Sequence, residues 1–332
     1  MQYLNPKLFD KDLPDGKAGV QQAGTRDGYG QALLELGDSN KDVVVLTADL
    51  AESTRVEEFG KKFPERFIEC GVAEQNMMGI AAGLALSGKI PFVSSYAVFS
   101  PGRSWDQLRV SVCYTEANVK VAGAQTGISV GPDGATHQAL EDIAIVRVLP
   151  NIVVEVPSDA IEAKKTTLAA AAHKGPFYFR FGREKTPIIT TEESSFEVGK
   201  AEVLKDGDDA TIVACGPLVY QSLLAAKQLE NKGINVRVIN NHTIKPIDAL
   251  TLAKAAKETG AIVTVEEHQV MAGMGAAVAE SLAKNYPVPI EFIGMQDTFG
   301  ESGNTNELYE KYGMSPDAIF KAVENVLKRK VK

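Results

Sequence analysis

Cysteine is scarce in this sequence, and the few cysteines do not form a binding pattern. Only Cys70, Cys113 and Cys215 are present, an odd number with no pair spaced as Cys-x-x-Cys. Disulfide frameworks and zinc cages both need grouped cysteines. We therefore expect neither, and a reducing compartment is favoured.

Long apolar runs are also missing. No run approaches the roughly 18 residues that a membrane-spanning helix requires. The first residues, Met1 to Lys7, lack the apolar core of a signal peptide. We therefore expect a cytoplasmic protein without a membrane partner.

Positive charge is in deficit, with 35 Lys and Arg against 43 Asp and Glu and a formal net charge of −8. The sequence shows no basic patch that could meet nucleic-acid phosphates, so nucleic acid is not an expected partner. Small anionic substrates stay compatible with this charge, because a few local arginines can bind an anion on an acidic protein.

The 332 residues suggest two domains, each with alternating strand-like and helix-like segments. In the first part, strands are predicted at 42–50, 67–70, 92–95, 119–123, 152–156 and 177–180. Helices are predicted from Thr25 onward and at 74–87, about 103–114, about 138–148 and about 159–173. This alternation is typical of a doubly wound parallel sheet.

A second α/β run follows the polar segment that ends at Asp209. Its strands are predicted at 210–214, 236–239 and 261–265, and its helices at 217–232, 248–258, 274–284 and after Asn304 and Ser315. We therefore predict two successive doubly wound α/β domains. The expected division is an N-terminal arm at 1–19, a first domain at 20–190, a linker at 191–208 and a second domain at 209–332.

One carboxylate stands at the head of an apolar stretch. After Glu74, apolar residues occupy almost every side of a helix, which predicts a helix buried all round. These residues are Met77, Met78, Ile80, Ala81, Leu84 and Ala85. A carboxylate in that setting needs a partner. The ordinary alternative is a first-turn residue that interacts with the helix dipole.

Three motifs occur in order along the first domain. They are Gly71-Val72-Ala73-Glu74-Gln75-Asn76-Met77, then Pro91-Phe92-Val93-Ser94-Ser95-Tyr96-Ala97-Val98-Phe99, then Gly131-Pro132-Asp133-Gly134-Ala135-Thr136-His137-Gln138. The first resembles the segment that carries the catalytic glutamate in transketolases and 1-deoxyxylulose-5-phosphate synthases, which use thiamine diphosphate. The second resembles the aromatic pocket for the cofactor's aminopyrimidine, and the third resembles the substrate loop.

The resemblance implies roles around the cofactor. Glu74 would hydrogen-bond the N1′ atom of the aminopyrimidine and favour the imino form that removes the thiazolium proton. Phe99 would stack on this ring, with Tyr96 beside it. Asp49, at the carboxyl end of the 42–50 strand, is predicted to contact the cofactor. Without the motif, an aromatic pair after a strand is ordinarily part of the core.

The resemblance also implies roles toward a sugar. His137 would contact the donor's carbonyl-end hydroxyl and move protons, and Asp133 would bind a hydroxyl of the sugar chain. Positions that bind the sugar phosphate are matched by Arg26, Ser53 and Arg183, with Arg180 as the competing choice for the last. The alternatives are an ordinary turn for His137 and surface positions for the arginines.

Departures from the family pattern affect the substrate side. Gln125 stands where transketolases have a histidine that helps bind phosphate, and Pro132 stands where an acid is usual. Sugar preference or phosphate affinity can therefore differ. Gly102 shifts the alignment of the following segment with the family's corresponding segment. No role is therefore assigned to Arg103 or Asp106.

The family's magnesium motif, Gly-Asp-Gly followed by Asn, does not occur here. Asp206-Gly207-Asp208 has the wrong order. No metal ligand is therefore assigned in this chain, and Mg²⁺ and the diphosphate of thiamine diphosphate are expected on a separate N-terminal subunit. An α₂β₂ assembly is expected by analogy with the family's dimers. The second domain lies away from the chemistry in the family, so His268 and the turn 273–275 are expected to be structural.

These expectations combine into one hypothesis with rivals. The chain resembles the pyrimidine-binding and C-terminal domains of a transketolase, which implies the C-terminal subunit of a split enzyme. Such an enzyme transfers a two-carbon ketol unit from a ketose phosphate to an aldose phosphate through dihydroxyethyl-thiamine diphosphate. The rivals are the β subunit of a 2-oxo acid dehydrogenase, a synthase fragment, and a non-catalytic regulatory subunit with the same fold.

Overall fold

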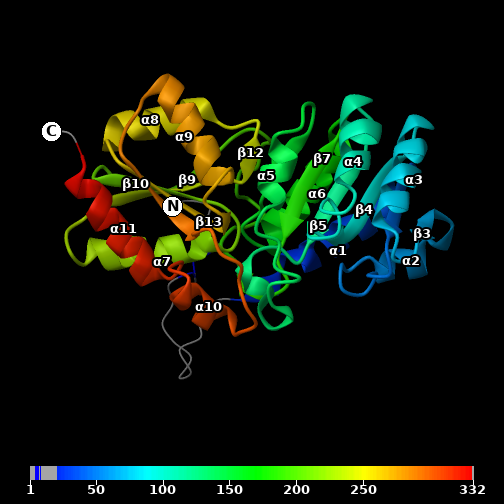
Figure 1. Ribbon diagram of the computed structural model, residues 1–332, viewed down its shortest axis with the longest axis horizontal. Helices are drawn as coiled ribbons and strands as arrows, with labels where there is room; N and C mark the ends of the chain where they lie inside the picture. The colour runs from blue at the N-terminus through cyan, green and yellow to red at the C-terminus, as the bar shows by residue number, and fades with distance from the viewer. Residues whose placement is uncertain (1–3, 7, 9–20, 331–332) are drawn as a thin grey trace.

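The computed structural model describes residues 4–6, 8 and 21–330, and it holds two α/β units side by side (Figure 1). Apart from residues 4–6 and 8, the arm predicted at 1–19 lies outside the described residues. Leu4 forms a β-bridge with Thr190, and Leu8 is buried. No described helix has the length and apolarity that crossing a membrane requires.

A seven-stranded sheet forms the first unit, in the spatial order β12-β6-β7-β5-β4-β2-β3. Its strands are β2 (Val43–Thr47), β3 (Phe67–Glu69), β4 (Ile90–Tyr96), β5 (Lys120–Ala124), β6 (Val153–Glu155), β7 (Phe177–Phe181) and β12 (Thr243–Lys245). All pairings are parallel except that of β12 with β6. Since β12 comes from the second half of the chain, that half completes one edge of the first sheet.

Helices cover both faces of this sheet. Alternate residues of β2 enter different cores: Val43 and Val45 pack with α1 (Thr25–Ser39) and α6 (Ala160–Ala172), whereas Val44 and Leu46 pack with the helices opposite. Those opposite helices are α3 (Glu74–Leu86), the π-helix η2 (Leu108–Tyr114) and α5 (Asp142–Arg147). A parallel strand buried on both faces needs an uninterrupted apolar run, which is what Val43 to Leu46 provide.

Shorter elements connect these layers. They are α2 (Glu57–Lys62), η1 (Pro64–Arg66), α4 (Trp105–Gln107), η3 (Ile128–Asp133), and the antiparallel pair β1 (Gln22–Gly24) with β8 (Lys185–Pro187). The helix predicted at about 138–148 begins only at Asp142, because residues 138–141 complete the loop that follows β5.

The second unit has a five-stranded sheet in the order β14-β13-β10-β11-β9. Its strands are β9 (Glu202–Lys205), β10 (Ala210–Ala214), β11 (Val236–Asn240), β13 (Ile262–Gln269) and β14 (Ile290–Met295). Its helices are α7 (Leu218–Glu230), α8 (Ala249–Thr259), α9 (Met274–Asn285), α10 (Thr305–Lys311) and α11 (Pro316–Lys328). Helices α7 and α11 pack on one face, and α8 and α9 on the other. The predicted class, two successive doubly wound α/β domains, is confirmed.

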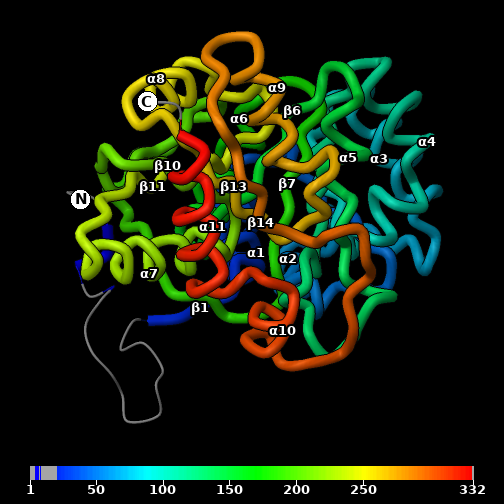
Figure 2. The backbone as a smooth tube through the Cα atoms, turned by 60° about the vertical axis from the view of Figure 1, so that its left-hand side comes forward, coloured from blue at the N-terminus to red at the C-terminus, as the bar shows by residue number. Residues whose placement is uncertain are grey.

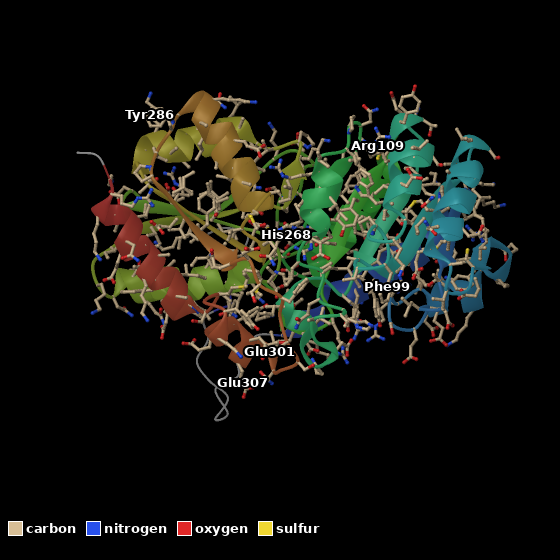
Figure 3. The ribbon with its side chains drawn as sticks, in the orientation of Figure 1. Phe99, Arg109, His268, Tyr286, Glu301 and Glu307 are labelled. Atoms are coloured by element: carbon tan, nitrogen blue, oxygen red, sulfur yellow. The ribbon has the colours of Figure 1, made fainter. Side chains whose placement is uncertain are left out.

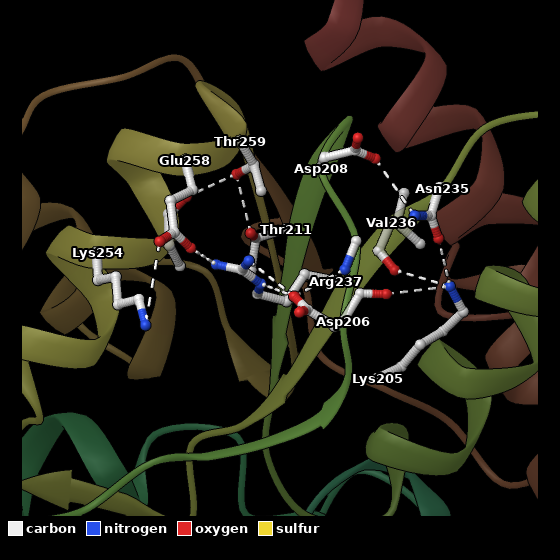
Figure 4. Close-up of polar contacts among 12 residues, drawn as sticks. Lys205, Asp206, Asp208, Thr211, Asn235, Val236, Arg237, Lys254, Glu258 and Thr259 are labelled. Atoms are coloured by element: carbon white, nitrogen blue, oxygen red, sulfur yellow. Dashed lines mark hydrogen bonds and ion pairs between the residues drawn. The ribbon is translucent and has the colours of Figure 1, made fainter. Parts of the chain in front are cut away.

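The segment predicted as a linker, 191–208, contributes to the second sheet. Its strand β9 pairs antiparallel with β11. Beyond β9, Asp206 binds the guanidinium of Arg237 at 2.7 Å, and Asn235 Nδ2 donates to Asp208 Oδ1 at 3.3 Å (Figure 4). The carboxylates of Asp206-Gly207-Asp208 therefore hold the loop between β9 and β10 against its neighbours.

Candidate active site

The predicted site residues gather at one edge of the first sheet. Tyr96 ends β4, Asp49 and Arg183 each follow the end of a strand by two residues, and His137 lies in the loop after β5. Because β2, β4, β5 and β7 run parallel, their carboxyl ends meet at the same edge. Open α/β sheets bind ligands at this edge.

Three rings form a cluster there. The rings of Tyr96 and Phe99 stack, with centroids 5.9 Å apart and planes inclined by 24°. The His137 ring meets both edge-on, 5.5 Å from Phe99 and 5.9 Å from Tyr96. His137 Nδ1 lies 2.8 Å from Thr136 Oγ1. The structure thus brings the second and third motifs together, with all three rings only partly buried.

Glu74 connects to this cluster through an arginine. Its side chain is 4% exposed, and Arg103 Nη1 donates to its two carboxylate oxygens at 3.1 and 3.3 Å. The same guanidinium lies over the Phe99 ring, 4.2 Å from its centroid. Arg103 is therefore the partner that the buried carboxylate required. Glu74 does occupy the first turn of α3, as the ordinary interpretation has it, but its carboxylate is paired with a side chain.

Helix α3 is not buried all round in this chain, so that prediction is wrong. Met77, Met78, Ala81 and Ala82 face the core. The opposite face is open to solvent: Gln75, Asn76, Gly79, Gly83 and Leu86 are exposed. A side chain placed at Gly79 or Gly83 would meet nothing within 4 Å. The apolar residues that suggested complete burial are buried or partly buried, and the solvent-exposed side of the helix consists of polar residues, glycines and Leu86.

Exposed apolar side chains continue beside α3. Val72 and Leu86 are each 70% exposed, and on the neighbouring η2 Tyr114 is 84% and Val110 44% exposed. We call these four residues, with Gly79 and Gly83, the α3–η2 face. A large exposed apolar patch on a soluble domain ordinarily marks an interaction surface.

Arg26, Arg55 and Arg183 lie near one another at this edge. Arg26 Nη1 donates to the Ser53 carbonyl at 3.0 Å. Burial lowers the pKa of Arg26, and the positive charges of Arg55 and Arg183 lower it further. Arg55 was missed in the sequence; it stands two residues after Ser53, has a left-handed backbone (φ 65°), and binds Asp27 at 2.8 Å. Like charges held this close favour an anion between them.

The two competing arginines, Arg180 and Arg183, have different surroundings. Arg180 is 3% exposed and is committed to Asp142 at 3.0 Å and to the Glu267 carbonyl at 3.2 Å. Arg183 is 32% exposed, and its Nη1 donates to Asp133 Oδ1 at 2.8 Å and to the Val130 carbonyl at 3.3 Å. Arg183 is therefore the one able to meet a ligand.

The remaining residues singled out in the sequence differ in how far they are exposed to solvent. Asp49 is exposed, and its N–H donates to Glu69 Oε1 at 2.8 Å, an oxygen that also receives the Gly71 N–H at 2.8 Å. Gln125 is 3% exposed, and within the described residues its Oε1 has no hydrogen-bond partner. Pro132 and Asp106 are exposed.

The chemistry of these residues suits one half of thiamine diphosphate. A flat aromatic face beside a buried carboxylate fits a heteroaromatic ring that carries a nitrogen base. Across residues 4–6, 8 and 21–330, no three His, Cys, Asp or Glu side chains come together as a metal site. The fit of the ring cluster and Glu74 is to the pyrimidine ring.

Comparisons with known proteins cover most of the chain. Residues 21–188 match the model of the transketolase pyrimidine-binding domain, and residues 199–319 match that of the transketolase C-terminal domain. A putative transketolase C-terminal section from Methanocaldococcus jannaschii is 45% identical over 92% of this chain and 97% of its own length. A 6-deoxy-6-sulfo-D-fructose transketolase subunit from Clostridium sp. is 42% identical over 92% of this chain and 95% of its own.

A solved structure is similar to this chain in both sequence and fold. It is described as a split gene transketolase, an inactive β4 tetramer, and is 47% identical to this chain. The two superpose with a TM-score of 0.87, covering 94% of this chain and all of that one.

The contact between Glu74 and Arg103 can be tested by a double-mutant cycle. We expect Arg103→Met to lower the free energy of unfolding by about 1 kcal/mol, a modest value because half of the Arg103 side chain is in water. Glu74→Gln should remove most of that cost, since no buried charge is then left unpaired. Urea unfolding of the four proteins measures the coupling, and strictly additive effects would contradict the pairing.

Proposed function

The chain belongs to the transketolase family, and we propose that it is the C-terminal subunit of a split transketolase. In this proposal it acts with an N-terminal subunit to transfer a two-carbon ketol unit from a ketose phosphate to an aldose phosphate. The observation that carries the proposal is the buried Glu74 carboxylate next to the cluster of Phe99, Tyr96 and His137.

Thiamine diphosphate supplies, when bound, the carbanion-stabilising chemistry that detaches a two-carbon unit from a sugar. This chain's residues would hold the pyrimidine half. Phe99 and Tyr96 offer it a flat face, Asp49 stands at the neighbouring strand end, and Glu74 keeps a carboxylate at the ring nitrogen. Because Glu74 is 4% exposed, its hydrogen bond forms in a low dielectric and is strong.

The substrate residues divide between two ends of a sugar. His137 has its Nδ1 engaged with Thr136, which leaves Nε2 to meet a hydroxyl and to exchange its proton. Asp133 accepts from a hydroxyl further along the sugar. Arg26, Arg183 and the added Arg55 receive the anionic end, and Ser53 fixes Arg26 through its carbonyl.

The remaining cofactor contacts belong, in this proposal, to the partner. The N-terminal subunit holds Mg²⁺ and the diphosphate, and an α₂β₂ assembly brings it to Glu74. The α3–η2 face supports this arrangement, because the helix whose exposed side needs a cover is the helix that begins with Glu74. The β4 tetramer of the solved relative is described as inactive, which also supports dependence on a second kind of subunit.

Glu74 is the residue on which the catalytic role depends. In a mixture of both subunits with thiamine diphosphate and Mg²⁺, we expect Glu74→Ala to lower kcat by about 10²–10⁴-fold, the usual range for a lost acid–base group. Assembly should persist, and the exposed Glu58→Ala serves as the control. Unchanged turnover of Glu74→Ala would overturn the role given to Glu74.

The arginine cluster predicts which end of the sugar is anionic. We expect Arg183→Gln to raise the KM for a phosphorylated donor about tenfold or more, since a hydrogen bond to a charged group is lost. The KM for the same sugar without its phosphate should change little. The name of one relative supplies a third substrate to test, a 6-sulfo sugar. A lower KM for this sugar than for the phosphorylated sugar would mean that the arginines bind a sulfonate group and not a phosphate group.

A further inference from the structure

The second domain forms hydrogen bonds with the loop that carries Asp133 and His137 and with the residues just before it. Glu267, near the end of β13, is 4% exposed and points its carboxylate at Ser129 in the first domain. Ser129 donates to it twice, from its N–H at 2.9 Å and from Oγ at 3.1 Å. One buried carboxylate of the second domain therefore fixes the start of the substrate loop.

Further contacts come from the segment between β14 and α10 and from the first residue of α10. Thr305 Oγ1 donates to the Ser129 carbonyl at 3.3 Å, Gln138 Nε2 donates to the Glu301 carbonyl at 3.0 Å, and the N–H of Gly303 donates to the Gly131 carbonyl at 3.4 Å. Figure 2 shows this segment, in orange, leaving the second domain and passing along the first. Glu301 and Phe99 lie on the same lower side of the molecule, with His268 between the two domains (Figure 3).

Two glycines show how closely the domains approach. Gly127 has φ 78°, and a Cβ there would lie 2.8 Å from the Glu267 side chain. Gly134 has φ 72°, and its Cβ would lie 2.5 Å from Ser302 Oγ. Both positions combine a left-handed backbone with no room for a side chain, so the loop is shaped against the second domain.

The chain of contacts continues from Ser129 to Arg183 and Asp133, which are proposed to bind the substrate. Val130 follows Ser129, and its carbonyl accepts from Arg183, whose guanidinium also binds Asp133 at 2.8 Å. Moving Ser129 would therefore shift both the anion-binding arginine and the sugar-binding carboxylate. Positioning errors of about 1 Å at a site can cost a hundredfold in rate.

We propose that Glu267 is a positioning residue: through Ser129 it sets the loop of Asp133 and His137 for the sugar donor. The second domain thus takes part in substrate binding, whereas the resemblance to transketolases implied that it lies away from the chemistry. This inference rests on the proposed function for its catalytic consequence. The mechanical link itself is a property of this chain alone.

The neighbouring Glu266 offers a matched control. It is also buried, at 1% exposed, and its carboxylate accepts two backbone N–H groups, from Met274 at 2.6 Å and Gly275 at 2.8 Å. Those groups open α9, so Glu266 holds a helix of its own domain. Glu266→Met removes the two hydrogen bonds to α9, whereas Glu267→Met removes the two to Ser129 and the contact with Tyr309 of α10. Only Glu267→Met therefore releases the loop.

The first test is amide hydrogen exchange on the full chain without a partner. We expect Glu267→Met to speed exchange of the peptide 127–138 about tenfold and to leave the start of α9 unchanged. Glu266→Met should show the reverse. Glu267→Gln, which restores one acceptor, should recover most of the protection. If Glu267→Met does not fold, Ser129→Ala should give a smaller change in the same peptide.

The second test is kinetics in the mixture of both subunits. We expect Glu267→Met to lower kcat/KM for the ketose donor about tenfold while the apparent affinity for thiamine diphosphate stays within about twofold. Unchanged exchange at 127–138 would overturn the positioning role whatever the activity. If exchange responds but the wild-type mixture transfers no ketol unit, the proposed function fails and the link between the domains stands.

Discussion

Arg180 must be paired, because a guanidinium that is 3% exposed has lost almost all of its hydration. Its partners come from three parts of the chain: Asp142 at the start of α5, the Ala139 carbonyl just after the loop of Asp133 and His137, and the Glu267 carbonyl in the second domain. These contacts of Arg180 connect the two domains. Because Ala139 directly follows the loop of Asp133 and His137, this pairing ties the end of that loop to the second domain.

Much of the site was predictable because parallel sheets leave little freedom. Once β2, β4 and β5 are known to be parallel, Asp49, Tyr96 and the loop of His137 have to end at one edge. The contact of Arg103 with Glu74 was not predictable, since Gly102 obscured the register. Arg55 was missed as well, because its place beside Arg26 depends on a left-handed turn that sequence patterns do not reveal.

The central strands and most helices were also predictable, since buried strands such as Val43–Thr47 read as continuous apolar runs. The edge strands β9, β12 and β14 were not, because they are short or partly exposed and β12 crosses to the other sheet. The domain limits at 190 and 209 remain a prediction. The exposed side of α3 was not predicted either. The apolar residues of this helix suggested burial on every side, but this chain covers only part of it.

The proposed division of the active site makes catalysis depend on two subunits. The most direct measurement is a ketol-transfer assay with thiamine diphosphate and Mg²⁺ on this chain alone, on a candidate N-terminal subunit alone, and on their mixture. We expect transfer in the mixture and none from either subunit alone. Transfer by this chain alone would contradict this expectation, because the diphosphate would then be held without a partner.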